Sequence, residues 1–206
     1  MFDRKAHWEK VYGGKSPIEV SWYQKEPTLS MCLIHNTGVA PDAAIIDVGG
    51  GASTLVDWLC ADSYTNISVL DISANALDHA RKRLAERGCD VNWHNQDVVN
   101  FDPPQQFSIW HDRAVFHFLT SKADRVKYVN AVKRTLAPGG HLILMAFAIG
   151  GPEKCSGLDI VQYDANKLMA ELGEGFELLE TGEEIHSTPV GGEQKFAYFH
   201  IVRQPS

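Results

Sequence analysis

Short apolar runs alternate along this chain with longer stretches in which apolar residues recur at helical spacing. Short runs rich in Ile, Val and Leu are typical of buried strands, and the sequence predicts them at residues 43–48, 67–72, 90–98, 107–112 and 141–147. The stretches between them predict helices at residues 53–61, 73–88, 122–140 and 164–173. Strands that alternate with helices indicate crossover connections and a mostly parallel sheet that is covered on both faces.

The two ends of the chain depart from this alternation. Residues 3–12 and 27–38 predict two helices ahead of the first strand. Residues 176–185 and 194–203 predict two strands joined by a loop with Pro and Gly, as in an antiparallel hairpin. We therefore expect one doubly wound α/β domain with a seven-stranded, mostly parallel sheet. Its parts are an N-terminal helical cap, a central core and a C-terminal part of loops with the hairpin, at residues 1–40, 41–147 and 148–206.

Composition narrows the class of protein. The formal net charge is −7, and Lys and Arg are scattered, whereas a nucleic-acid binder shows a basic stripe; we expect no nucleic-acid partner. The longest apolar run, residues 142–149, is too short to cross a bilayer, and the charged N-terminus lacks the apolar segment of a secretory signal. Four cysteines lie far apart without a Cys-x-x-Cys pair, which predicts free thiols, no metal site and a cytoplasmic location.

A glycine turn directly follows the first predicted strand. Asp47, Gly49, Gly51 and Ser53 form the pattern Asp-x-Gly-x-Gly-x-Ser. Such a turn lets a ligand approach the backbone, and the following helix offers free N–H groups, so the pattern predicts a nucleotide-like ligand. Thr54 stands where the nicotinamide fingerprint needs a third glycine, and the P-loop pattern is absent too. A carboxylate just before the glycines repels a pyrophosphate and favours a ligand with an amino group or a positive charge.

These residues resemble the first motif of the class I S-adenosylmethionine-dependent methyltransferases, and the resemblance continues along the chain. Asp71 and Ile72 end the second predicted strand, where the family holds the ribose hydroxyls. Asp97 and Val98 end the third, where the family contacts the adenine amino group, and the segment LAPGGHLIL looks like the turn before the family's fifth strand. The resemblance implies S-adenosyl-L-methionine as the cofactor, S-adenosyl-L-homocysteine as its product and no metal.

The N-terminal segment HWEKVYGGKSPIEVSWYQ is similar to a subgroup that includes protein lysine methyltransferases acting on elongation factors and citrate synthase. That likeness implies that Trp8, Tyr12 and Trp22 close over the cofactor, and aromatic faces suit both a sulfonium ion and adenine. The alternative is that Trp8 and Tyr12, four residues apart, form the buried stripe of a helix. The subgroup usually has Lys-Gly-Thr where this chain has Arg-Ala-Val at residues 113–115, a departure that speaks against a protein-lysine acceptor.

Candidate catalytic groups follow the fourth predicted strand. The resemblance places Asp112 beside the cofactor. His111 and His117 could take a proton from a hydroxyl, thiol or amine nucleophile; alternatively they satisfy backbone groups beside the pocket, and alignment alone supplies much of the rate. Cys155 lies in a glycine-rich loop on the expected acceptor side, where either contact with a soft acceptor or plain apolar packing would suit it. Residues 186–192 could close the same pocket.

The sequence therefore predicts a methyltransferase that uses S-adenosyl-L-methionine and acts on a small molecule, because no added recognition domain is present. Three alternatives stay open: a protein methyltransferase, a non-catalytic cofactor-binding regulatory protein and a nicotinamide-dependent oxidoreductase. We expect a monomer or homodimer with no membrane partner.

Overall fold

One twisted sheet organises the chain, which a computed structural model describes over residues 2–14, 16–103 and 105–205. The sheet has seven strands in the order β3-β2-β1-β4-β5-β9-β8. These strands are β1 (Ile45–Val48), β2 (Ile67–Asp71), β3 (Val91–Asn95), β4 (Phe107–Arg113), β5 (Leu136–Phe147), β8 (Phe176–Ser187) and β9 (Glu193–Arg203). The predicted doubly wound α/β fold is confirmed.

The C-terminal hairpin is also confirmed, with one detail that the sequence left open. Strands β1 to β5 run parallel, whereas β9 runs antiparallel to both β5 and β8. The last strand of the chain therefore lies inside the sheet, beside β5, and β8 forms the edge. The carboxyl ends of the parallel strands all reach the same end of the sheet, where ligands bind in this architecture.

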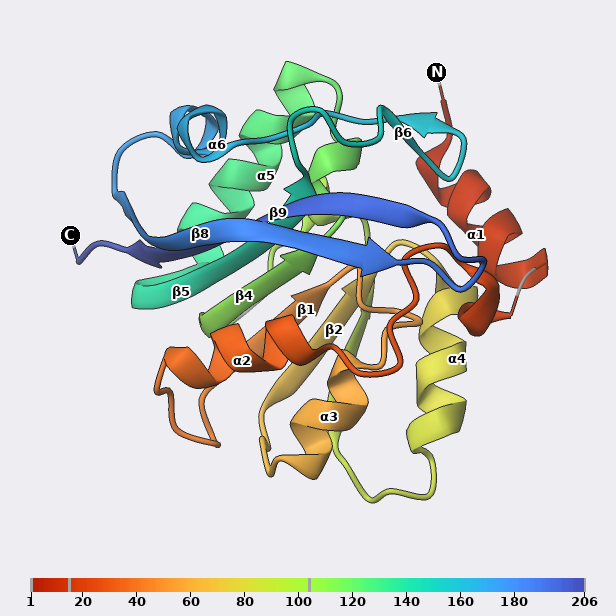
Figure 1. Cartoon of the computed structure of the whole chain (residues 1–206). Coiled ribbons are helices and arrows are strands. Elements are labelled where there is room, and N and C mark those ends of the chain that lie inside the picture. The colour runs from red at the N-terminus through yellow and green to blue at the C-terminus, as the bar shows by residue number, and fades with distance from the viewer. Residues whose placement is uncertain (1, 15, 104, 206) are drawn as a thin grey trace.

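Helices cover both faces of the sheet. The helices are α1 (Arg4–Gly14), α2 (Thr28–Asn36), α3 (Leu55–Ala61), α4 (Ala74–Leu84), α5 (Lys122–Thr135) and α6 (Ala165–Leu172). In Figure 1, α5 and α6 lie on one face, α2 and α3 lie on the other, and α1 stands at one end beside α4. Two large apolar clusters correspond to these two faces. Because burial of apolar area is the main favourable term in folding, the two clusters hold the layers together.

Alternation along the two central strands decides which side chains meet. Ile109 packs in the cluster under α2, α3 and α4, and its neighbour Trp110 packs in the cluster under α5. Successive side chains of a strand point to opposite faces, so His111 shares the face of Ile109. Asp47 of β1 stands directly opposite His111 in the parallel register. The sheet thereby brings these two polar side chains together.

Two local details depart from the prediction. The helix expected over residues 122–140 ends at Thr135, because Leu136 is already extended and pairs with Phe107 of β4. The long loop after β5 contains a small hairpin of β6 (Lys154–Cys155) and β7 (Leu158–Asp159). Within the described ranges, no helix is long and apolar enough to cross a membrane.

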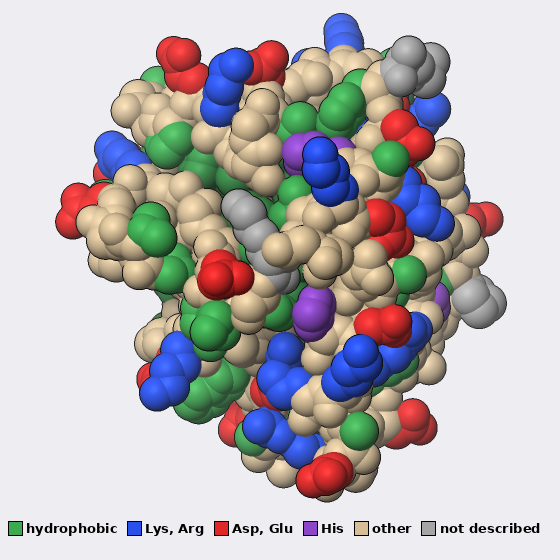
Figure 2. All heavy atoms as spheres, turned by 90° about the vertical axis from the view of Figure 1, so that its right-hand side faces the viewer, with side chains coloured by type: hydrophobic (Ala, Val, Ile, Leu, Met, Phe, Trp, Pro, Cys, Tyr) green, Lys and Arg blue, Asp and Glu red, His purple; other side chains and the backbone are tan. Residues whose placement is uncertain are grey.

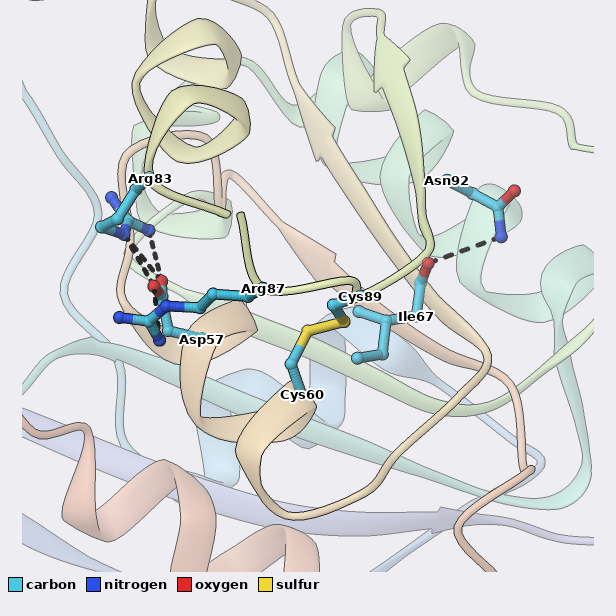
Figure 3. The surroundings of a disulfide bond; sticks show 7 residues. All are labelled: Asp57, Cys60, Ile67, Arg83, Arg87, Cys89 and Asn92. Atoms are coloured by element: carbon cyan, nitrogen blue, oxygen red, sulfur yellow. Dashed lines mark hydrogen bonds and ion pairs between the residues drawn. A yellow bond between two sulfur atoms is a disulfide. The ribbon is translucent and has the colours of Figure 1, made fainter. Parts of the chain in front are cut away.

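The expectation that all cysteines are free thiols is wrong. Cys60 at the end of α3 and Cys89 just before β3 form a disulfide (Figure 3), with their Cα atoms 6.0 Å apart. The two segments meet because α3 and α4 are neighbours: Asp57 of α3 forms ion pairs with Arg83 and Arg87. A pairing that depends on how two helices pack cannot be read from cysteine spacing.

Candidate functional site

Two neighbouring cavities, which share part of their walls, open at the carboxyl ends of β1, β2 and β4. The empty volume of the first cavity is about 760 Å³ and that of the second is about 550 Å³, and part of each is open to solvent. The first cavity reaches from Asp71 and Asp97 to Cys155, and the second follows the glycine turn. The walls of both include Tyr12, Trp22, Val48, Gly49 and Arg113. We call these five shared wall residues the junction of the two cavities.

Other side chains lie so close to the three glycines of the turn that none of them has room for a Cβ. Gly49 has a φ of +70°, a conformation that favours glycine, and a Cβ there would lie 2.0 Å from the Cγ2 of Val115. A Cβ on Gly50 would lie 2.2 Å from the Asp47 carboxylate, and one on Gly51 would lie 2.7 Å from that of Asp71. The turn therefore folds tightly onto the carboxylates at the ends of β1 and β2. Gly51 faces Asp71 and is not part of either cavity wall.

Asp47 forms the polar floor of the second cavity. Its Oδ1 is 2.7 Å from His111 Nδ1, and His111 Nε2 is 2.9 Å from the Ser30 hydroxyl of α2. Asp47 is 2% exposed, yet its Oδ2 has no hydrogen-bond partner among the described residues. Burying an unpaired carboxylate oxygen is unfavourable, so this atom is ready to accept a hydrogen bond from a ligand. Ser53 lies in the same wall.

Asp71 lies at the carboxyl end of β2 and lines the first cavity together with Ile72. Its two oxygens accept hydrogen bonds from the backbone N–H groups of Gly51 (3.0 Å) and Ser73 (2.8 Å). Burial raises the pKa of this carboxyl to about 6, and the nearby charges of Asp47 and Glu9 act in the same direction. Each oxygen has further acceptor capacity, which suits a pair of ribose hydroxyls.

Asp97 and Val98 form the far end of the first cavity. Asp97 accepts a hydrogen bond from the Val99 backbone N–H at 3.2 Å and pairs with Arg4 of α1 at 3.0 Å. Arg4 also reaches Asp124 of α5, at 3.3 Å. These two ion pairs hold the start of α1 beside the first cavity, which Arg4 also lines. The sequence offered no signal for Arg4, because its partners lie 93 and 120 residues away.

An aromatic cluster covers the first cavity. Trp8, Tyr12, Trp22 and Phe118 are in its wall. The ring centroids of Trp8 lie 5.0 Å from Phe118 and 5.7 Å from Trp22, both edge to face, and Trp22 Nε1 donates to the Tyr12 hydroxyl at 3.2 Å. Such edge-to-face pairs are favourable, so the rings stabilise one another at the wall of the cavity. The first three of these residues were predicted, whereas Phe118 was not.

Asp112 does not face either cavity, contrary to the expectation that it borders the cofactor. As the residue after His111 on β4, it points to the opposite face, where its Oδ2 accepts from the Tyr128 hydroxyl at 2.6 Å. It also accepts from the backbone N–H groups of Val115 and Phe116. Burial raises its pKa to about 6. Asp112 therefore stabilises the turn after β4.

His117 does not face a cavity either, so its expected role as a base is not supported by its position. It is fully buried in η3 (Phe116–Phe118). Its Nδ1 accepts a 3.4 Å hydrogen bond from the Phe147 backbone. Burial, with the nearby charge of Arg113, lowers its pKa to about 3. His111 does line the second cavity, but both of its ring nitrogens already have partners.

Of the residues expected on the acceptor side, Cys155 reaches the first cavity and the predicted closing loop does not. Cys155 of β6 is 4% exposed and lines that cavity, and burial raises the pKa of its thiol to about 12. The predicted closing loop, residues 186–192, is not part of either wall. It instead holds the cap, because His186 Nε2 lies 2.8 Å from the Ser21 carbonyl oxygen. Among the described residues, no group of three His, Cys, Asp or Glu side chains could hold a metal ion.

The residues that line the two cavities suit a ligand with a nucleoside at one end and an amino acid at the other. Asp71, Asp97 and the aromatic cluster suit a ribose and a flat base in the first cavity. The free oxygen of Asp47 suits an ammonium group in the second. S-adenosyl-L-methionine has this composition, and it supplies an electrophilic methyl group when bound.

Comparison with known proteins gives the same fold. Residues 45–140 match the model of a methyltransferase domain. The eEF1A lysine and N-terminal methyltransferase of Danio rerio is 24% identical over 151 residues, which are 71% of this chain and 22% of that protein. Nodulation protein S of Rhizobium tropici is 28% identical over 111 residues, 54% of this chain and 46% of that protein. The chain thus spans less than half of either relative.

Solved structures match over a larger part of the chain. The N-methyltransferase NodS of Bradyrhizobium japonicum WM9 in complex with S-adenosyl-L-homocysteine has a TM-score of 0.72 at 15% identity, and the match covers 99% of this chain and 100% of that one. A structure from echinomycin biosynthesis, concerned with conversion of a disulfide bond into a thioacetal group, has a TM-score of 0.80 at 17% identity and covers 98% and 92%. These likenesses establish the fold.

Proposed function

We propose that this chain is a class I S-adenosylmethionine-dependent methyltransferase and that it transfers the methyl group of S-adenosyl-L-methionine to a small-molecule acceptor. The observation that carries this proposal is how closely the junction of the two cavities is covered. Tyr12 of the junction is 7% exposed and the side chain of Arg113 is 11% exposed, and Cys155 in the adjoining wall of the first cavity is 4% exposed. An acceptor enclosed by these residues must fit entirely inside the protein, as a small molecule does.

The chemistry needs little from acid–base groups of the protein. The lone pair of the acceptor forms the new bond to the methyl carbon, the electrons of the broken carbon–sulfur bond stay on sulfur, and S-adenosyl-L-homocysteine is released. An acceptor that reacts through a hydroxyl, a thiol or an N–H group also releases a proton. Neither His111 nor His117 is placed to take that proton, so we propose that alignment and exclusion of water, rather than a histidine base, supply the rate.

A protein acceptor is the second candidate. It is favoured by the N-terminal segment and by relatives such as EEF1A lysine methyltransferase 2 of Homo sapiens, which is 22% identical over 188 residues and covers 72% of that protein. The residues at 113–115 differ from that subgroup, and Arg113 places a positive charge at the junction, which disfavours a lysine side chain. For these two reasons we favour the small molecule.

The test uses S-adenosyl-L-methionine labelled in its methyl group, added with the purified protein to a cell lysate. We expect label in the small-molecule fraction, and none with the Asp71→Ala variant, which should no longer hold the ribose. Label in a protein band would support the second candidate. If the cofactor binds by calorimetry but no label moves, a non-catalytic cofactor-binding role would replace both.

We further propose a cytoplasmic location, as expected from the sequence, although the Cys60–Cys89 disulfide is more typical of an oxidising compartment. Thiol trapping in intact cells would test it: a largely reduced pair agrees with this location and a fully oxidised pair opposes it. The oligomeric state, monomer or homodimer, stays a prediction for light scattering.

A further inference from the structure

Arg113 is a charged side chain at the junction of the two cavities with donors to spare. Its Nη1 donates to the Trp22 carbonyl oxygen at 2.9 Å, and its guanidinium lies 4.7 Å from the centre of the Phe196 ring. Its Nε and Nη2 are buried without a hydrogen-bond partner among the described residues. Burial lowers the pKa of this group only to about 10, so it stays charged at pH 7. A buried cation with two unused donors is costly unless an anion compensates it.

The neighbouring carboxylates do not fill that role. Glu184 Oε2 of β8 is 3.9 Å from Arg113 Nη2, beyond hydrogen-bond distance, and is itself buried without a partner. The charge of Asp47 also acts on Arg113, but within the described chain Asp47 pairs through Oδ1 with His111 and forms no ion pair with Arg113. The Cys155 thiol, whose pKa burial raises to about 12, is neutral at pH 7. The charge of Arg113 is therefore only loosely balanced within the protein.

We propose that Arg113 binds an anionic group of the methyl acceptor, so that the acceptor is a small molecule with a carboxylate or similar anion beside its nucleophile. This inference rests on the proposed small-molecule methyl transfer. The planar guanidinium fork matches a carboxylate through two parallel hydrogen bonds. Ala114, Val115 and Phe118 line the cavity next to it and suit an apolar body. An anion there would also offset the repulsion between Arg113 and the positive charge of the cofactor.

The carboxylate of the cofactor itself is the competing source of such an anion, because Arg113 also lines the second cavity. The two sources predict different losses in the Arg113→Gln variant. If Arg113 holds the cofactor, that variant loses affinity for S-adenosyl-L-homocysteine but keeps its affinity for 5′-methylthioadenosine, which has no carboxylate. If Arg113 serves the acceptor, both affinities stay within about 3-fold of wild type, a change below the worth of one charged hydrogen bond.

The acceptor side is tested with benzoate against benzyl alcohol, its neutral counterpart of similar shape. Binding to the protein saturated with S-adenosyl-L-homocysteine is followed by the fluorescence of the cavity tryptophans. We expect wild type to prefer benzoate by about 10-fold or more, the worth of a charge-assisted hydrogen bond. Arg113→Gln should lose this preference and Arg113→Lys should keep part of it. Arg134→Gln is the matched control, because Arg134 pairs with Asp102 on the surface.

Each result decides the proposal. Equal binding of benzoate and benzyl alcohol by wild type overturns it, and so does a loss of S-adenosyl-L-homocysteine affinity that spares 5′-methylthioadenosine. If Arg113→Gln does not fold, the wild-type preference and the Arg113→Lys variant still give the answer. Label that moves into protein in the lysate assay would refute the proposed small-molecule acceptor and leave the anion preference as a separate measurement.

Discussion

At the scale of single residues, the three carboxylates at the ends of β1, β2 and β4 differ in what they can still bind. Asp47 keeps one oxygen without a partner, Asp71 has one backbone donor on each oxygen, and Asp112 accepts from Tyr128 and from the turn that follows it. From the sequence, all three are expected beside the cofactor, Asp112 through the family resemblance alone. Their side chains separate them: Asp47 and Asp71 line the cavities, and Asp112 points to the other face.

Cofactor affinity should depend on pH through Asp71. Its pKa of about 6 in the free protein means that the carboxyl becomes protonated as the pH falls below 6. Ribose hydroxyls donate to the ionised form, so affinity for S-adenosyl-L-homocysteine should be constant near pH 7 and decline by up to about 10-fold per pH unit below 6. Calorimetry between pH 5 and pH 7 measures this. In Asp71→Asn the affinity should be lower and free of this decline; a decline of equal size there would refute the assignment.

His117→Phe should leave methyl transfer within about 3-fold of wild type. A general base contributes about 100-fold or more, but His117 is fully buried, outside both cavity walls, and its Nε2 has no partner within the described chain. Transfer of label in the lysate assay and thermal unfolding are measured together. A 100-fold loss of transfer in a variant that unfolds like wild type would restore the catalytic role expected from the sequence.

At the scale of elements, the strands and most helices could be predicted, because apolar period and length are local properties of the chain. The end of the fifth helix was placed too late: Pro138 and the two glycines after it mark a stop, but the helix already ends at Thr135, where Leu136 becomes extended and pairs with Phe107. The orientation of side chains after β4 was missed for a similar reason. Arg113 is the last residue of β4 and keeps the face of His111, whereas the position of His117 depends on the tight η3 turn, which follows a residue with positive φ, Ala114 (71°).

No local sequence pattern indicated the contact between helices α1 and α4. Glu9 of α1 accepts hydrogen bonds from the backbone N–H groups of Ala74 (2.7 Å) and Asn75 (3.2 Å) and from the Ser73 hydroxyl (2.9 Å). A carboxylate suits a helix N-terminus, where free N–H groups and the helix dipole favour negative charge. The first helix of the chain thus helps to cap the fourth, beside the cavity that α1 covers.

Glu9→Ala should loosen the attachment of α1, which we call the lid because its side chains line the first cavity. We expect a loss of about 1 kcal/mol in the free energy of unfolding, as for other helix caps, with faster amide hydrogen exchange in residues 4–14 and weaker cofactor binding. Glu86→Ala, an exposed position after α4, is the matched control. If exchange in α1 is the same in both variants, Glu9 does not hold the lid.

At the scale of the whole molecule, two features matter: the distribution of charged side chains and the single disulfide found among the described residues. On the face that Figure 2 turns to the viewer, acidic and basic side chains are mixed over the coloured residues, in keeping with a net charge of −7 spread along the chain. The Cys60–Cys89 disulfide joins α3 to the segment before β3 (Figure 3). It also lies outside the walls of both cavities. It therefore bears on the stability of the whole fold rather than on the site.

Removing this crosslink should lower stability without changing cofactor binding. The disulfide closes a loop with a sequence separation of 29, and constraining a loop of that size in the unfolded chain is worth about 3–4 kcal/mol in the loop-entropy model. The double variant Cys60→Ser/Cys89→Ser should lose about that much by denaturant unfolding, and reductant should bring wild type to the same value. Cys32→Ser, which removes an exposed free thiol, is the control and should change neither. Equal stability of oxidised and reduced wild type would mean that the bridge contributes nothing, and weaker S-adenosyl-L-homocysteine binding by the double variant would mean that the position of α3 affects the glycine turn.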